Sequence, residues 1–348
     1  MSLRPTAVTG SFLSVVAFLL TAAPAPAAPA DQGAGAGAAA PAAAPSVPAP
    51  EAPEAPEAPE APETPEAPEA PEAPAAPDAP AAPAAPRPGG VVPVAHRGAS
   101  AYAPENTLAA ADKADELGIT WVENDVQRTK DGELIVMHDE TLSRTTDVEE
   151  VFPDRAPWKV ADFTAAEIDR LDAGSWFDAR YAGEGVPTLT EFLDTITANN
   201  QKLLLEIKKP ELYPGIERDI LRELRKEGWL DRRHLRTRLA VQTFDAASLR
   251  RVHELKPEVK TGFLGTPKVA DLPRYAAFAD QVNPRYTTVT AEYVDAVHAT
   301  RGPSGRPLEL FTWTVDDADT AARMADLGVD GIISNRPDVV RDAARGRS

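Results

Sequence analysis

Five side chains that lie in or directly after apolar segments could together carry out acid–base and metal chemistry. Glu123 and Asp125 are two residues apart in a β-rich segment, so strand alternation places both on one face, and Glu206 lies in the next such segment. Carboxylate oxygens are the hard ligands that Ca²⁺ and Mg²⁺ take in proteins. His96 and His138 each follow an apolar segment, and two imidazoles suit paired general acid and general base catalysis near neutral pH. The pattern therefore predicts metal-assisted catalysis with proton transfer.

Two cations, an acid and an aromatic residue accompany these groups. Arg97 and Lys208 adjoin the histidine and carboxylate positions, where they could stabilise negative charge that develops on a substrate. The alternative to metal binding by Glu123, Asp125 and Glu206 is that these carboxylates form inward-facing ion pairs with Lys208. Glu105 either orients Arg97 or begins a helix, and Trp313 lines either a pocket or the core.

Eight β-rich segments interleaved with helical patterns follow residue 91 and must position these groups. This alternation over about 250 residues predicts an α/β fold of the (β/α)8 (TIM) barrel type, in which the C-terminal ends of the strands form the active-site mouth. A doubly wound open sheet has the same alternation and is the structural alternative. The predicted strands are Val91–Ala95, Thr120–Gln127, Lys202–Ile207, Leu239–Thr243, Lys260–Leu264, Ala279–Asn283, Leu308–Thr314 and Gly331–Ser334. The amphipathic segments between them include Leu108–Leu117, Leu189–Ala198, Ala246–Leu255 and Ala318–Leu327.

One segment interrupts the alternation after the second strand. The Asp131-Gly132 pair suits a hairpin turn that returns the chain to His138. Residues 140–186 then separate the second strand from its helix, and their polar and aromatic composition predicts a small cap-like insertion at the top of the barrel. Thr164–Glu167 and Thr188–Glu191 have the spacing of capping boxes, so each predicts the start of a helix.

The N-terminal 30 residues have the pattern of an export signal. Arg4 supplies the charge, Ser11–Ala23 the apolar run and Ala28-Pro29-Ala30 a cleavage site. The apolar run is shorter than the roughly 20 residues needed to span a bilayer. We therefore expect a signal peptide over residues 1–30, no stable membrane insertion after its cleavage, and a secreted protein that is extracellular or associated with the cell wall.

Residues 31–90 form a separate region with a strict repeat. Twenty-one of the 35 prolines lie before residue 90, and Glu-Ala-Pro recurs through residues 51–74. Such a segment lacks the apolar side chains that could offset the entropy of ordering, so we expect a disordered, polyproline-rich linker. Its acidic repeat predicts a solvated spacer, and a role in cell-wall binding or adhesion is the alternative. Residues 91–348 remain as one barrel domain.

Charge and cysteine content exclude several classes of partner and site. The net charge of −18 divides into −8 for the first 90 residues and −10 for the rest. A domain this acidic, without a basic cluster, is not expected to bind nucleic acid or an anionic membrane surface. The chain has no cysteine, which excludes disulfides and thiolate metal sites.

Five strings resemble the glycerophosphodiester phosphodiesterase family over essentially all of residues 91–348: VAHRGASAYAPENT, VENDVQRTKDGELIVMHD, LLLEIKKP, FTWTVDD and GVDGIISNRPD. The resemblance implies a (β/α)8 barrel that hydrolyses glycerophosphodiesters to glycerol 3-phosphate and an alcohol with one divalent metal ion. It also implies that His96 and His138 are catalytic and that the metal ligands are Glu123, Asp125 and Glu206. By the same resemblance, Arg97 and Lys208 bind the phosphate and Trp313 lines the substrate pocket.

The resemblance leaves the metal, the substrate and one motif open. We expect Ca²⁺ in preference to Mg²⁺, because Ca²⁺ tolerates an irregular oxygen shell and an exported enzyme meets more of it. The family commonly has Thr-Asp where this chain has Ser334-Asn335, and we expect this departure not to touch the core chemistry. Small glycerophosphodiesters are the expected substrates, with wall teichoic acid a further candidate. The alternatives are a phospholipase D of the sphingomyelinase type and a non-catalytic wall-associated binding protein.

Overall fold

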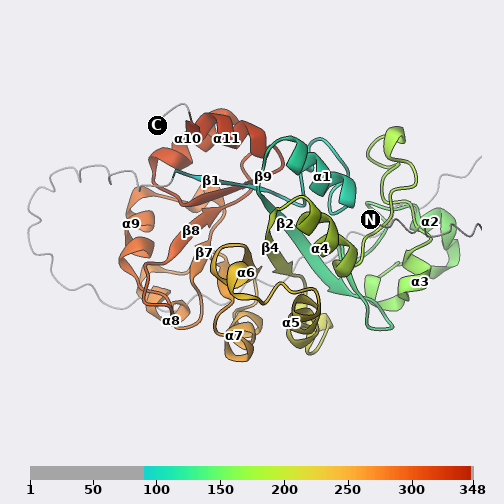
Figure 1. Cartoon of the computed structure of the whole chain (residues 1–348), viewed down its shortest axis with the longest axis horizontal. Coiled ribbons are helices and arrows are strands. Elements are labelled where there is room, and N and C mark those ends of the chain that lie inside the picture. The colour runs from blue at the N-terminus through green and yellow to red at the C-terminus, as the bar shows by residue number, and fades with distance from the viewer. Residues whose placement is uncertain (1–89, 346–348) are drawn as a thin grey trace, which may run out of the picture. The chain divides into compact units, whose positions relative to one another are not determined.

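A closed barrel of parallel strands forms the centre of the computed structural model, which describes residues 90–345 (Figure 1). The first strand, β1 (Val92–Ala95), pairs in parallel with both β2 (Trp121–Arg128) and β9 (Gly331–Ser334), so the parallel strands leave no free edge. The predicted barrel is therefore confirmed, and the open sheet is excluded. The strands between β2 and β9 around the barrel are β4 (Lys202–Ile207), β5 (Leu239–Thr243), β6 (Lys260–Leu264), β7 (Gln281–Asn283) and β8 (Glu309–Thr312). The predicted signal peptide and linker lie outside the described residues.

Helices lie around the outside of the barrel (Figure 1). Their buried apolar side chains pack against those of the strands. In α4 (Leu189–Ala198) the buried side chains recur at i, i+3, i+4 and i+7, which is the spacing of one helix face. Both predicted capping boxes are present, at the start of α4 and of the short helix α3 (Ala165–Ile168). The other helices around the barrel are α1 (Leu108–Glu116), α5 (Ile216–Lys226), α6 (Arg232–Thr237), α7 (Ala246–Leu255), α8 (Leu272–Tyr275), α9 (Ala291–Ala299), α10 (Ala318–Asp326) and α11 (Pro337–Arg345). None of the helices in residues 90–345 is long and apolar enough to cross a membrane.

The barrel interior has an apolar layer that lies beneath a polar one. The apolar layer consists of Val94, Leu204, Ala240, Phe311 and Ile333. Because alternate residues of a strand share a face, the residues two positions further along project inward one level higher. Those positions in β1, β4, β5 and β8 lead to His96, Glu206, Gln242 and Trp313. The strand period therefore delivers the predicted site residues to the C-terminal end of the barrel.

The insertion after the second strand has a small core of its own. The strand β3 (Leu134–Val136) pairs with β2 in antiparallel register, and residues 140–186 follow with α2 (Val148–Val151) and α3. Figure 1 shows this segment in light green beside the end of β2. Its core contains Ile135, Leu142, Val160, Phe163 and Ile168, all at most 1% exposed.

Short 3₁₀ helices occur both in the insertion and in the loops of the barrel. They are Pro153–Arg155, Val160–Asp162, Ala179–Tyr181, Pro210–Leu212, Val269–Asp271 and Tyr286–Thr288.

Candidate active site

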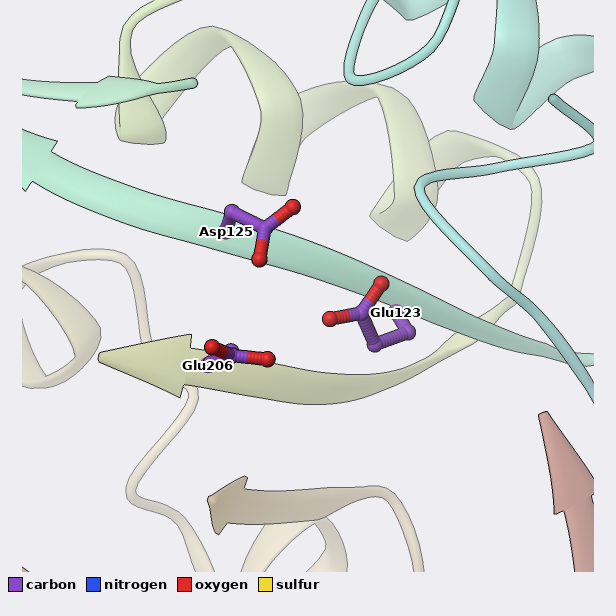
Figure 2. Close-up of side chains that lie close together, drawn as sticks. All are labelled: Glu123, Asp125 and Glu206. Atoms are coloured by element: carbon purple, nitrogen blue, oxygen red, sulfur yellow. The ribbon is translucent and has the colours of Figure 1, made fainter. Parts of the chain in front are cut away.

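Three buried carboxylates meet at the barrel mouth. Glu123 and Asp125 project from β2 towards Glu206 on the neighbouring strand β4, as Figure 2 shows. Asp125 and Glu206 are partners in the parallel register of the two strands, and one oxygen atom from each of the three residues lies within 4.8 Å of the others. This cluster could hold a metal ion.

The electrostatics of the cluster favour an added cation. Burial, and then the charges of Asp125 and Glu206, raise the pKa of Glu123 well above its ordinary value. Burial and Asp125 likewise raise the pKa of Glu206 to about 7. At Asp125 burial acts in the same direction, but Lys208 and Arg97 outweigh it and lower the pKa to about 2. Without further positive charge, the three groups do not all ionise near neutral pH, so the donor set fits a divalent cation.

Lys208 forms ion pairs with two of the three carboxylates, as the alternative to metal binding requires. Its Nζ lies 2.6 Å from Oε1 of Glu206 and 3.6 Å from Oδ1 of Asp125. The Glu123 carboxylate instead accepts the backbone N–H of Arg97 at 2.8 Å and has no lysine or arginine side chain in an ion pair within the described chain. Lys208 therefore balances only part of the negative charge of the cluster, and a divalent cation held by all three carboxylates could balance the rest.

The two predicted catalytic histidines are each held in one tautomer. Nδ1 of His96 lies 2.7 Å from Oδ1 of Asn335, whose amide is fixed because its Nδ2 donates to Asp316. Nδ1 of His138 lies 2.6 Å from Oδ1 of Asp139. Both partners are acceptors, so Nδ1 carries the hydrogen in each ring and Nε2 keeps its lone pair.

Burial keeps both rings neutral around pH 7. Burial, reinforced by the charge of Arg97, lowers the pKa of His96 to about 4. Burial also lowers the pKa of His138, against the opposing effect of the Asp125 carboxylate. A neutral imidazole with a free Nε2 can accept a proton and later return it, as paired acid–base catalysis requires.

Arg97 is fixed from several sides at the start of the loop after β1. Its Nη1 donates to Oε1 of Glu105 at 2.7 Å, and its Nε lies 3.4 Å from Oδ2 of Asp125. Nε is buried and has no hydrogen-bond partner of good geometry, so its contact with Asp125 is an ion pair without a hydrogen bond. Glu105 therefore orients Arg97, whereas α1 begins later in the chain with Thr107 as its cap. Gly98 allows the close turn, because a Cβ there would lie 2.5 Å from Cβ of Ala110.

The pocket has a charged wall and an apolar wall. Trp313 lines the apolar wall, where its ring makes an edge contact with Phe244 at 5.6 Å between centroids. Phe244 is 51% exposed, which is unusual for an aromatic ring and places it at the entrance. The charged wall contains His96, Arg97, Glu123, His138, Glu206 and Lys208, and the apolar wall adds Leu264 and Ile333.

Three polar residues of the site were not expected from the sequence. Asn106 donates to Asp125 at 2.8 Å, and Gln242 lies 3.5 Å from Glu123. The third is Asn335 of the Ser-Asn departure, which lies beside the site because its Oδ1 holds Nδ1 of His96. Gln242 and Asn335 lie within or directly after strands, and this position is the signal that could have identified them.

Comparison with known proteins agrees with this geometry. Residues 96–339 match the model of the Glycerophosphoryl diester phosphodiesterase family. A glycerophosphodiester phosphodiesterase of Caldanaerobacter subterraneus is 37% identical over 256 residues, which cover 72% of this chain and 97% of that protein. A glycerophosphodiester phosphodiesterase of Bacillus subtilis is 34% identical over 273 residues, covering 74% of this chain and 88% of that protein.

A solved structure shares the fold. It is an Oleispira antarctica phosphodiesterase in complex with the product sn-glycerol-3-phosphate, and it is 28% identical with a TM-score of 0.62. The match covers 72% of this chain and 95% of that chain. The protein therefore belongs to the glycerophosphoryl diester phosphodiesterase family and is an enzyme of that family.

Proposed function

We propose that this enzyme hydrolyses glycerophosphodiesters to glycerol 3-phosphate and an alcohol, with His96 and His138 as the general acid–base pair. The observation that carries the proposal is the pocket, in which two neutral imidazoles lie with two cations and a buried carboxylate cluster. The product bound to the Oleispira antarctica phosphodiesterase supports this substrate class.

The side chains divide the work of phosphodiester hydrolysis. Arg97 and Lys208 bind the phosphate and stabilise the charge that develops on it. One neutral imidazole takes a proton from the attacking oxygen at its Nε2. The other acts as the acid in its imidazolium form, which the negative charge of the bound phosphodiester favours, and it gives its Nε2 proton to the leaving alcohol. A divalent cation held by Glu123, Asp125 and Glu206 would supply further positive charge for the phosphate oxygens.

We propose Ca²⁺ as the metal, because three carboxylates from two strands form an irregular oxygen set that Ca²⁺ accepts more readily than Mg²⁺. We also propose that the enzyme is exported by the leader in residues 1–30 and acts outside the cell or at the wall. Small glycerophosphodiesters are the proposed substrates, and wall teichoic acid is a further candidate.

The test is turnover of the purified protein on a panel of glycerophosphodiesters, with and without chelator. We expect activity that chelation removes and that Ca²⁺ restores better than Mg²⁺. His96→Ala and His138→Ala should each lower kcat by roughly 10²- to 10⁴-fold. His253→Ala is the matched control, because His253 lies on the outer helix α7 and outside the pocket.

The same assays separate the alternatives. Release of choline from intact sphingomyelin vesicles, without turnover of glycerophosphocholine, would favour a phospholipase D. Binding to cell walls without any turnover would favour a binding protein. Full activity after exhaustive chelation, or normal kcat in both histidine variants, would contradict the proposed mechanism.

A further inference from the structure

One arginine of the insertion binds two carboxylates that lie next to the active site. Arg144 lies between the buried residues Leu142 and Thr145, at the start of the insertion. Its Nη1 and Nη2 donate to the two carboxylate oxygens of Glu105 at 2.9 and 2.7 Å. Its Nε donates to Oδ2 of Asp139. One guanidinium thus holds two carboxylates that come from different loops.

Each of these carboxylates in turn holds a residue of the proposed machinery. The other oxygen of Asp139 accepts the hydrogen bond from Nδ1 of His138 at 2.6 Å. Oε1 of Glu105 accepts the hydrogen bond from Nη1 of Arg97 at 2.7 Å. Neither bond requires Arg144 to touch the pocket, and Arg144 does not line it.

We propose that Arg144 is a positioning residue that sets the placement of the proposed acid–base residue His138 and of the phosphate-binding residue Arg97 together. By this contact the insertion completes the catalytic geometry of the barrel. The inference rests on the proposed function, since it concerns the same reaction.

The guanidinium of Arg144 and the carboxylates of Glu105 and Asp139 can stay hydrogen-bonded to one another at neutral pH. A guanidinium offers five donors in a planar fork, so it can bind one carboxylate in bidentate fashion and a second one through Nε. Although burial acts in the opposite direction, hydrogen bonds from Arg144 and His138 lower the pKa of Asp139 to about 2. The hydrogen bond from Arg144 likewise lowers the pKa of Glu105 against the effect of burial. All three groups therefore remain charged at neutral pH.

The backbone that carries Arg144 is itself fixed. Thr146 Oγ1 donates to the carbonyl oxygen of Leu142 at 2.7 Å, and Thr145 Oγ1 contacts the sulfur of Met137 at 3.5 Å. Both threonines are buried. The side chain of Arg144, by contrast, is 44% exposed, so its ion pairs contribute little to stability. A role in positioning should therefore appear in the kinetics far more than in folding.

The test compares Arg144→Lys with Arg155→Lys. Arg155 is also a forked arginine of the insertion, and it donates to Glu167 and to the carbonyl oxygen of Asp162, away from the pocket. Lysine keeps the charge but has a single nitrogen, so it cannot bind one carboxylate through a planar two-nitrogen fork and a second one through a third nitrogen. We expect Arg144→Lys to lower kcat and raise KM for glycerophosphocholine, with kcat/KM about 10- to 100-fold lower. Arg155→Lys should keep both values within about twofold.

Double variants separate the effect of Arg144 on His138, through Asp139, from its effect on Arg97, through Glu105. Asp139→Asn weakens the hold on His138 and should lower kcat, whereas Glu105→Gln weakens the hold on Arg97 and should raise KM. Arg144→Lys added to Asp139→Asn should then mainly change KM, and added to Glu105→Gln it should mainly change kcat. The inference is overturned if Arg144→Lys has the kinetics of Arg155→Lys in an otherwise active enzyme. An inactive wild type would instead overturn the proposed function and this inference with it.

Discussion

The two histidines of the site have partners of different charge. The partner of His96 is the neutral amide of Asn335, whereas that of His138 is the carboxylate of Asp139. With no charge on its direct partner, His96 is governed by burial and by Arg97, which lower its pKa to about 4. The nearest carboxylate on this side of the ring is that of Asp316, which accepts a hydrogen bond from Asn335 and does not contact His96 directly.

Exchanging the two residues behind His96 should raise its pKa. In the double variant Asp316→Asn/Asn335→Asp, the net charge and the hydrogen bond between the two side chains are kept, but the carboxylate now accepts from Nδ1 of His96. A carboxylate in direct contact favours the imidazolium, by about one to three pKa units. NMR titration of the His96 ring should show this rise, and an acidic limb of kcat/KM that reports His96 should move to higher pH.

The control for the exchange is His138, whose titration should change little because its partner is untouched. An unchanged pKa of His96 in a folded double variant would show that Asn335 does not set the charge state of the ring.

At the scale of elements, strand alternation accounts for what the sequence could predict. The period of two placed Glu123 and Asp125 on one face, and consecutive parallel strands brought Glu206 beside them. The bounds of the strands were less exact, since β7 begins at Gln281 and β8 ends at Thr312. Such ends depend on neighbouring strands and loops, which local patterns do not contain.

Contacts between distant loops could not be predicted. His96 and Asn335 are 239 positions apart, and they meet only because β1 and β9 pair when the barrel closes. Arg144 reaches Glu105 across 39 positions from an insertion whose fold has no periodic signal. No local pattern marks either partner, so only the closed structure identifies them.

Barrel closure itself depends on a small residue in the last strand. A Cβ at Gly331 would lie 2.5 Å from the ring of Phe311 in the apolar layer beneath the site. Gly331→Ala should therefore lower the free energy of unfolding by about 1–3 kcal/mol through overpacking. Denaturant titration measures this, and Phe311→Leu in the same chain should recover part of the loss.

Gly185→Ala is the matched control, because a Cβ there meets no atom within 4 Å. Equal stabilities of the two alanine variants would contradict the steric argument for Gly331.

At the scale of the whole molecule, the carboxylate cluster links metal binding to folding. Glu123, Asp125 and Glu206 are buried together only when the barrel is closed, so the unfolded chain has no comparable site. A cation that binds only the folded form stabilises it by mass action. The domain should therefore be more stable with its metal than without, and the difference should depend on pH.

The direction of this pH dependence follows from the two raised pKa values. The folded metal-free protein holds a proton on Glu206 up to a pH of about 7, and the pKa of Glu123 is also raised well above its ordinary value, whereas the unfolded chain releases both protons near pH 4.5. At these two groups the unfolded state therefore binds fewer protons than the folded state, so their contribution to stability falls as pH rises from about 4.5 to 7. The lowered pKa values of His96 and His138 contribute a rise over part of the same range, so the contribution of the cluster is measured as a difference from a variant that lacks one of its carboxylates. The lowered pKa of Asp125, about 2, acts only at more acidic pH.

Thermal or denaturant unfolding in chelator across pH 4.5–7 measures the pH profile of stability, and comparison with Glu206→Gln isolates the part of that profile that belongs to the cluster. Glutamine cannot ionise, so the variant should lose less stability over the same interval than the wild type does. Saturating Ca²⁺ should oppose the cluster's contribution to the profile of the wild type and release protons on binding, because the cation allows all three carboxylates to ionise. Parallel stability profiles of the chelated wild type and Glu206→Gln would show that the carboxylates of the cluster do not hold extra protons in the folded state. Their pKa values would then not be raised by burial and mutual repulsion, and the electrostatic argument for a divalent cation at this site would fail.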